Sequence, residues 1–260
     1  MGSCHCAPSV RPVPTNNQVD SVKAVKNFFK FGLLPKSLYL AASARLKKRR
    51  TLRKRWGETE LELLPMIVPP GKLAVDIGAN NGLYTYFLSR VARHVVAYEP
   101  IPVLAQFLRR AVAANVSVRE KAVSDRAGKM DIHVPVVKGH PTYNIGSLDA
   151  AHNTGPCITY NIEVTTLDEE DLSDVGFIKI DIEGHELSAL RGAENTIRRD
   201  RPTILLEVLD TQDWESSALA FLSNLGYEIF VYEDRCLRHS SFSEQDKAGR
   251  NFVCFAKRTG

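Results

Sequence analysis

From residue 73 onward, short apolar segments alternate with amphipathic ones, and this alternation limits the chain to few folds. Apolar segments of strand length lie at residues 73–77, 95–98, 116–123, 177–182, 203–208, 227–231 and 252–255. Segments with helical spacing lie at residues 83–91, 103–114, 186–198 and 214–225. Because strand-helix alternation requires right-handed crossovers, we predict an α/β, Rossmann-like fold with a mostly parallel seven-stranded sheet and helices on both faces.

Residues 125–165 interrupt this alternation. They are rich in glycine and proline, and they contain alternating apolar and polar stretches at 130–136 and 158–164. Such a composition is typical of turns and half-buried strands. We therefore predict a strand-rich or loop insertion here.

The N-terminal part of the chain has a different composition. We predict a disordered segment at residues 1–20, a helical and basic extension at 21–64, and the ligand-binding domain at 65–260. Residues 45–55 hold eight Lys or Arg and no acid, whereas the remaining 26 basic residues are outnumbered by 30 acidic ones. A solvated helix face is our interpretation of this basic run, and peripheral contact of residues 20–55 with an anionic membrane is the alternative.

The sequence lacks the features that would indicate a membrane-spanning, secreted or metal-binding protein. It has no apolar run long enough to span a bilayer and no secretory signal. Its five cysteines show no metal-ligand spacing. We therefore expect reduced thiols and a cytoplasmic protein.

The first strand runs into a glycine-rich turn that begins with an acid, Asp76, followed by Gly78 and Gly82. In an open parallel sheet, ligands bind beyond the carboxyl ends of the strands. A carboxylate in this turn would repel the pyrophosphate of a dinucleotide, which needs bare amides. It would attract the sulfonium and ammonium groups of S-adenosylmethionine. The turn therefore favours S-adenosylmethionine over NAD.

The next two strands add candidate ligand contacts. Glu99 ends the second strand, where a carboxylate can accept hydrogen bonds from both ribose hydroxyls. NAD-binding folds use the same device, so Glu99 indicates a ribose rather than a particular nucleoside. The third strand ends near Ala122, where a backbone amide or a small side chain can meet the edge of the base.

Several polar groups follow the fourth strand. Asp181 and Glu183 are two residues apart, and Gly184 and His185 lead into the next helix. An acid that ends a buried strand usually needs a partner, so we place Asp181 in a functional site. Glu186 has an equally good explanation as an acid in a first helical turn.

These motifs together resemble the FkbM-type methyltransferase family. The matching segments are residues 75–80 with Gly82 and Thr85, Glu99 with Pro100, Ala122 with Asp125, and residues 144–148, 166–168, 179–186 and 206–207. The resemblance spans roughly residues 53–208. It implies a class I methyltransferase fold and O-methylation of sugars, polyketides or other secondary metabolites. It also implies that S-adenosylmethionine is held by Asp76, Gly78, Asn80, Gly82, Thr85, Glu99 and Ala122.

Methyl transfer to an alcohol requires positioning of the oxygen and removal of its proton. Our hypothesis is that Asp181 and Glu183 line the reaction site and that one of them accepts the proton directly or through His185. A Mg²⁺ ion held by Asp181 and Glu207 is an alternative that we do not favour, and we assign no metal. The expected acceptor is a hydroxyl of a small molecule or glycan.

Two other functions remain open at this stage. The basic run is compatible with a nucleic-acid methyltransferase, although the Asn/Asp-Pro-Pro-aromatic motif of base methylases is absent and an acidic pocket disfavours a polyanion. A catalytically idle scaffold that docks through the basic N-terminal helices is the second alternative.

Overall fold

The computed structural model describes residues 40, 59–137, 139–143, 155–210, 217–233, 236–240 and 248–257. All of them belong to one compact unit, Lys36–Gly260. The predictions for residues 1–20, for most of the extension at 21–64 with its basic run, and for residues 144–148 lie outside the described residues. None of the helices within the described ranges combines the length and apolar character needed to cross a bilayer.

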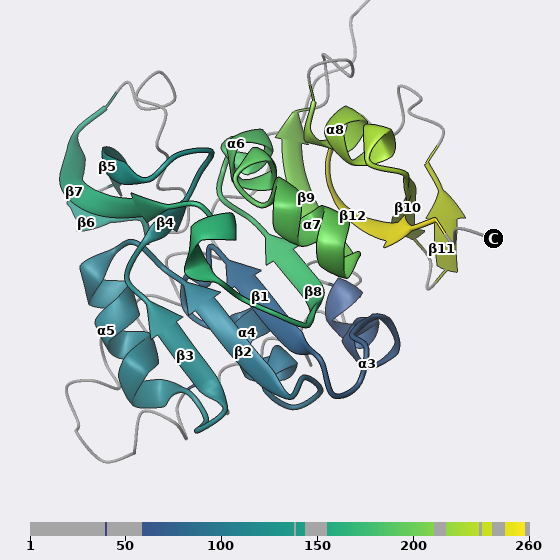
Figure 1. Ribbon diagram of the computed structural model, residues 1–260. Helices are drawn as coiled ribbons and strands as arrows, with labels where there is room; N and C mark the ends of the chain where they lie inside the picture. Colours follow the sequence, from purple (N-terminus) through teal and green to yellow (C-terminus); the bar gives the residue numbers. More distant parts are fainter. Residues whose placement is uncertain are drawn as a thin grey trace, which may run out of the picture. The chain divides into compact units, whose positions relative to one another are not determined.

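The central sheet follows the predicted α/β pattern, and the strands on one side of it are parallel (Figure 1). Its strands are β1 (Leu73–Ile77), β2 (His94–Tyr98), β3 (Val116–Arg119), β8 (Val175–Ile180), β9 (Thr203–Asp210), β10 (Tyr227–Glu233), β11 (Cys236–His239) and β12 (Ala248–Ala256). Their order is β11-β10-β12-β9-β8-β1-β2-β3. Strands β9, β8, β1, β2 and β3 are parallel, and β12 runs antiparallel to β9. The Rossmann-like fold class is confirmed.

The sheet has eight strands where the sequence predicts seven. The additional strand, β11, pairs antiparallel with the end of β10. Its four residues, Cys-Leu-Arg-His, carry no alternating apolar pattern. Pairing with a neighbouring edge, rather than local sequence, therefore defines this strand.

The insertion forms a second, four-stranded sheet, which confirms the strand-rich prediction. Its strands are β4 (Ala122–Val123), β5 (Gly128–Val137), β6 (His140–Pro141) and β7 (Cys157–Thr165), in the order β4-β7-β5-β6. The predicted third strand is thus divided, because β3 stays in the central sheet and β4 pairs with β7. The second sheet packs around Ile101, which follows the carboxyl end of β2 by three residues.

Short helices cover the central sheet. They are α3 (Leu64–Ile67), α4 (Leu83–Leu88), α5 (Pro102–Ala111), α6 (Glu186–Arg191), α7 (Glu194–Asp200) and α8 (Ala218–Asn224), with 3-10 turns at Thr59–Glu62 and Asp168–Glu170. The helix predicted at 186–198 is broken at Gly192 into α6 and α7. The observed α4 also ends three residues earlier than its predicted span of 83–91.

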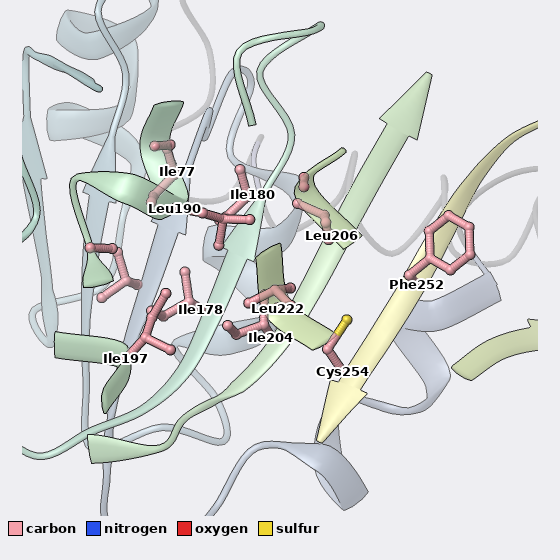
Figure 2. Close-up of a cluster of buried hydrophobic side chains, with 14 of the residues drawn as sticks. Ile77, Ile178, Ile180, Leu190, Ile197, Ile204, Leu206, Leu222, Phe252 and Cys254 are labelled. Atoms are coloured by element: carbon pink, nitrogen blue, oxygen red, sulfur yellow. The ribbon is translucent and has the colours of Figure 1, made fainter. Parts of the chain in front are cut away.

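Each face of the sheet has its own apolar core. On one face, Ile178 and Ile180 of β8 and their neighbours on β9 pack against Leu190, Ile197 and Leu222 of α6, α7 and α8 (Figure 2). The opposite face packs against α3 and α4. Because successive strand residues point to opposite faces, β8 is apolar along nearly its whole length.

Gly192 allows the second sheet to approach the α6–α7 break closely. A Cβ atom at this position would lie 1.9 Å from the carbonyl oxygen of Ser124, which directly follows β4. The backbone of Gly192 also accepts a hydrogen bond from the N–H of Asp168. Any side chain here would push the end of β4 away from the helices.

We predict that Gly192→Ala lowers the free energy of unfolding by about 1–3 kcal/mol, because the added methyl group overlaps backbone that cannot rotate away. Urea denaturation measures this change. The matched control is Gly155→Ala, since a Cβ at Gly155 meets no atom within 4 Å. Equal stability of the two variants would show that the close approach is not a constraint.

Candidate functional site

The candidate site lies where the parallel strands of the central sheet end. Asp76 is the fourth residue of β1, Glu99 directly follows β2, and Asp181 directly follows β8. Strand β1 lies between β8 and β2 and forms parallel pairs with both of them. Three of the carboxylates that the sequence singles out are therefore brought to one edge, as expected for an open parallel sheet.

The turn after β1 is held tightly against the neighbouring strands. Gly78 has a φ of +80°, and a Cβ there would lie 2.0 Å from the carbonyl oxygen of Asp181. Its N–H and that of Ala79 both donate to the carbonyl of Tyr98 at the end of β2. Glycine is thus required both by the left-handed backbone and by the contact with the end of β8.

The second glycine, Gly82, precedes α4 with a φ of +82°. A Cβ at this position would lie 2.5 Å from the Leu108 side chain of α5. Gly82 therefore allows α5 to pack against the start of α4. Both glycines of the predicted turn are thus required by contacts with neighbouring protein atoms.

Asp76 is fully buried, with an exposed fraction of 0%. Its Oδ2 accepts a hydrogen bond of 2.5 Å from the hydroxyl of Thr85 in α4. Among the described residues, none donates a hydrogen bond to its Oδ1. Burial raises the pKa of Asp76 above 3.8, while the nearby Lys179 ammonium opposes this effect. A buried carboxylate oxygen without a donor is energetically costly unless a ligand supplies one.

Glu99 is held in place by two backbone amides. Oε2 accepts from the N–H of Asn80 at 2.7 Å, and Oε1 accepts from the N–H of Ile101 at 2.9 Å. Asn80 has a φ of +50°, which directs its amide toward this carboxylate. Burial raises the pKa of Glu99 to about 7, although both amides favour the ionised form. The role of Asn80 is therefore to orient Glu99 through its backbone.

Lys179 is a site residue to which sequence reasoning assigned no role. It lies on β8 directly opposite Asp76 in the strand register. Its Nζ donates to Oδ2 of Asp181 at 2.8 Å and lies 4.7 Å from the centre of the Tyr84 ring. Its side chain is only 4% exposed. A lysine in an otherwise apolar strand was the available signal, because a buried ammonium requires anionic partners.

Beyond β8, a tight turn carries the remaining candidate acids. The Asp181 side chain is 30% exposed, so it is accessible despite its ion pair. Glu183 has a φ of +53° and Gly184 a φ of +94°. Glu186 accepts from the N–H of Gly184, and its pKa is raised by burial and, to a smaller extent, by the charge of Asp181. Glu186 thus closes the turn that carries Glu183.

His185 connects this turn to the end of β4. Its Nε2 lies 2.8 Å from the hydroxyl of Ser124, and that hydroxyl donates to Asp125 at 3.1 Å. Burial lowers the pKa of His185 below 6.5, while the charge of Asp125 opposes the shift. The sequence did not predict this pair, since Ser124 and His185 are 61 residues apart.

Ala122 and Glu207 complete the placement of the predicted residues. Ala122 is buried in the apolar cluster of the second sheet together with Ile101. Glu207 lies one residue beyond the last paired positions of β8 and β9, and Asp181 lies at the equivalent place on β8. Within the part of the chain that the structure describes, no cluster of three or more His, Cys, Asp or Glu side chains is arranged to hold a metal ion.

A comparison with known protein families identifies the family of this chain. A family model described as the methyltransferase FkbM domain matches residues 76–229, more than half of the 260-residue chain. The chain belongs to the FkbM methyltransferase family. It is accordingly an S-adenosylmethionine-dependent methyltransferase, which confirms the resemblance of its motifs.

Individual relatives of this methyltransferase are distant. Methyltransferase sdnD of Sordaria araneosa is 23% identical over 201 residues, which cover 62% of this chain and 76% of that protein. Methyltransferase 1 of Beauveria bassiana (strain ARSEF 2860) is 25% identical over 188 residues, covering 63% and 75%. A crystal structure of methyltransferase FkbM from Methylobacillus flagellatus KT superposes with a TM-score of 0.46 at 18% identity, covering 71% of this chain and 43% of that one. The methyltransferase thus matches less than half of the length of that solved chain.

The raised pKa of Glu99 predicts how the stability of the ligand-free enzyme depends on pH. Folding shifts this pKa from 4.5 to about 7. The folded state therefore binds more protons than the unfolded state between these values. The stabilisation is complete below pH 4.5 and is lost as the pH rises through about 7, by at most about 3 kcal/mol.

Urea denaturation at pH 5, 6, 7 and 8 tests this expectation. Glu99→Gln should show a smaller loss of stability over the same range, because it has no proton to release. The comparison at each pH cancels the opposite contribution of His185, whose lowered pKa adds stability as the pH rises. Parallel curves for the two proteins would contradict the prediction.

Proposed function

We propose that this enzyme transfers the methyl group of S-adenosylmethionine to a hydroxyl oxygen of a small molecule, such as a sugar or another secondary metabolite. The observation that carries the proposal is the buried carboxylate of Asp76, whose Oδ1 has no donor among the described residues. It lies at the same sheet edge as Glu99 and Asp181.

The residues present suit the chemistry of this donor. A sulfonium and an ammonium group are both cations, and they are favoured by an edge with several carboxylates. An ammonium N–H would satisfy the orphaned Oδ1 of Asp76. Two ribose hydroxyls would donate to Glu99, whose oxygens already accept one amide each and have further lone pairs. A pyrophosphate would be repelled by the same groups.

We assign the donor-binding residues accordingly. Asp76 would accept from the amino group, and Thr85 keeps the Asp76 side chain in one orientation. Glu99 would accept from the ribose, with Asn80 orienting it. Gly78 and Gly82 let the turn pack tightly against Asp181 and Leu108, which holds its backbone in position for a ligand. Ala122 contributes a small, buried surface at the start of the segment that leads to Ser124.

The chemical step depends on position and on proton removal. When bound, S-adenosylmethionine supplies an electrophilic methyl group on a good leaving group. The protein must hold the acceptor oxygen in line with it and accept the hydroxyl proton. Asp181 fits this task, because Lys179 holds Oδ2 while the side chain stays 30% exposed. Glu183 on the adjoining turn would help bind the acceptor, and His185 would pass the proton onward.

Product analysis tests the proposed reaction. Enzyme incubated with methyl-labelled S-adenosylmethionine and a metabolite extract should yield a labelled product whose mass spectrum places the methyl group on oxygen. Label found on nitrogen, on carbon or in nucleic acid would reject O-methylation.

Donor binding should depend on the two buried acids. We predict that Asp76→Asn and Glu99→Gln each weaken the affinity for S-adenosylhomocysteine by about 10- to 100-fold, since each removes a charged hydrogen-bond acceptor. Isothermal titration calorimetry measures the effect. Asp131→Asn is a matched control, because Asp131 is exposed and pairs with Asn161 on the second sheet. Unchanged affinity in both buried variants would remove these residues from the donor site.

Turnover should depend on the acids after β8. We predict that Asp181→Ala and Glu183→Ala reduce methyl transfer into the extract by about 100-fold or more, because the first impairs proton removal and the second impairs binding of the acceptor. Affinity for S-adenosylhomocysteine should change by less than about fivefold. Near-normal transfer in both variants would reject this assignment, and loss of donor binding would assign the two acids to the donor instead.

A further inference from the structure

The acidic edge of the sheet contains a buried cation, Lys179. Its side chain is 4% exposed, and its Nζ is 2.8 Å from Oδ2 of Asp181. The ring of Tyr84 lies 4.7 Å from the same nitrogen. A carboxylate and an aromatic face both stabilise an ammonium group, which offsets the cost of burying it. Lys179 therefore places a positive charge at this edge of the sheet.

The strand register places this charge beside the donor-binding acid. Lys179 on β8 pairs with Asp76 on β1. Both side chains point to the face covered by α4, since Asp76 contacts Thr85 and Lys179 contacts Tyr84. Lys179 thus lies between the carboxylate proposed to bind the donor and the carboxylate proposed to act on the acceptor.

The influence of this charge reaches both donor-binding acids. The Lys179 ammonium lowers the pKa of Asp76 and, to a lesser extent, that of Glu99, in each case against the larger effect of burial. Lys179 therefore favours the ionised form of these acids and at the same time cancels part of their negative potential. The electrostatic potential that a ligand meets beside these acids therefore depends on Lys179.

The donor and product of the proposed reaction differ by one charge. S-adenosylmethionine has a sulfonium, whereas S-adenosylhomocysteine has a neutral thioether of nearly the same shape. A positive charge beside the bound ligand acts differently on these two ligands, while shape and hydrogen bonding act on them alike. We propose that Lys179 is a specificity-determining residue that sets how strongly the pocket prefers the charged methyl donor over its neutral product. This inference rests on the proposed function.

The direction of the effect follows from the sign of the charge. A positive group repels the sulfonium and leaves the thioether unaffected. Lys179 therefore lowers the preference for S-adenosylmethionine and makes the enzyme more sensitive to inhibition by its product. Removal of the charge should increase the preference for the donor.

Calorimetric titration of both ligands at pH 8 tests the proposal. This pH lies above the pKa of about 7 that Glu99 has in the unmodified enzyme. In Lys179→Met, the ratio of the dissociation constant of S-adenosylhomocysteine to that of S-adenosylmethionine should rise roughly tenfold relative to the unmodified enzyme. Lys179→Arg, which keeps the charge, should leave the ratio within twofold.

Two further variants make the result specific. Lys179→Gln removes the charge but can still donate a hydrogen bond to Asp181, so it should show the same rise even if the Met variant fails to fold. Lys72→Met is the matched control, because Lys72 forms an exposed ion pair with Asp174 before the start of β1. Its ratio should be unchanged.

The outcomes separate this inference from the proposed function. If the unmodified enzyme binds neither ligand, the proposed function fails. If both ligands bind but the ratio in the folded Met and Gln variants stays within twofold of the original, Lys179 does not set the preference and the inference is overturned. A fall in the ratio would also overturn it, since the charge would then favour the donor.

Discussion

The burial of one carboxylate, Asp76, is the interaction on which the organisation of this site depends. An isolated ionised acid in a protein interior is strongly unfavourable, so its neighbours must compensate. Thr85 donates to one oxygen, and the ammonium of Lys179 lowers the pKa that burial raises. The second oxygen has no donor in the described part of the chain. The ligand-free site is thus incompletely satisfied, and a cationic ligand would complete it.

The fold holds this arrangement through backbone contacts that leave no room for side chains. Gly78 rests against the carbonyl of Asp181, and Gly192 rests against the carbonyl of Ser124. The first contact joins the turn after β1 to the end of β8. The second joins the helices after β8 to the segment that follows β4. The acids of the site therefore sit on backbone that packing keeps in place, which favours a preorganised pocket.

Preorganisation has a cost in stability. Burial raises the pKa of Asp76, Glu99 and Glu186, which means that their ionised forms are less favourable here than in water. These buried acids therefore weaken the folded state at this edge of the sheet, as groups at functional sites commonly do. One lysine limits that cost, and in our proposal the same lysine also sets the selectivity between donor and product. The positive charge of Lys179 would then affect both the stability of the folded state and the preference for donor over product.

Sequence alone determined the fold class and which acids gather at one edge of the sheet, because its signals are local. Buried parallel strands are continuous apolar runs, and the residues at their ends, such as Asp76, Glu99 and Asp181, converge in any open parallel sheet. Only the tertiary structure decided how these residues pair. The contact of Lys179 with Asp181 and Tyr84, the bond between Ser124 and His185, and the edge strand β11 each depend on segments that meet only after folding. A sequence pattern records which residues are available at an edge, whereas register and close packing fix which of them touch.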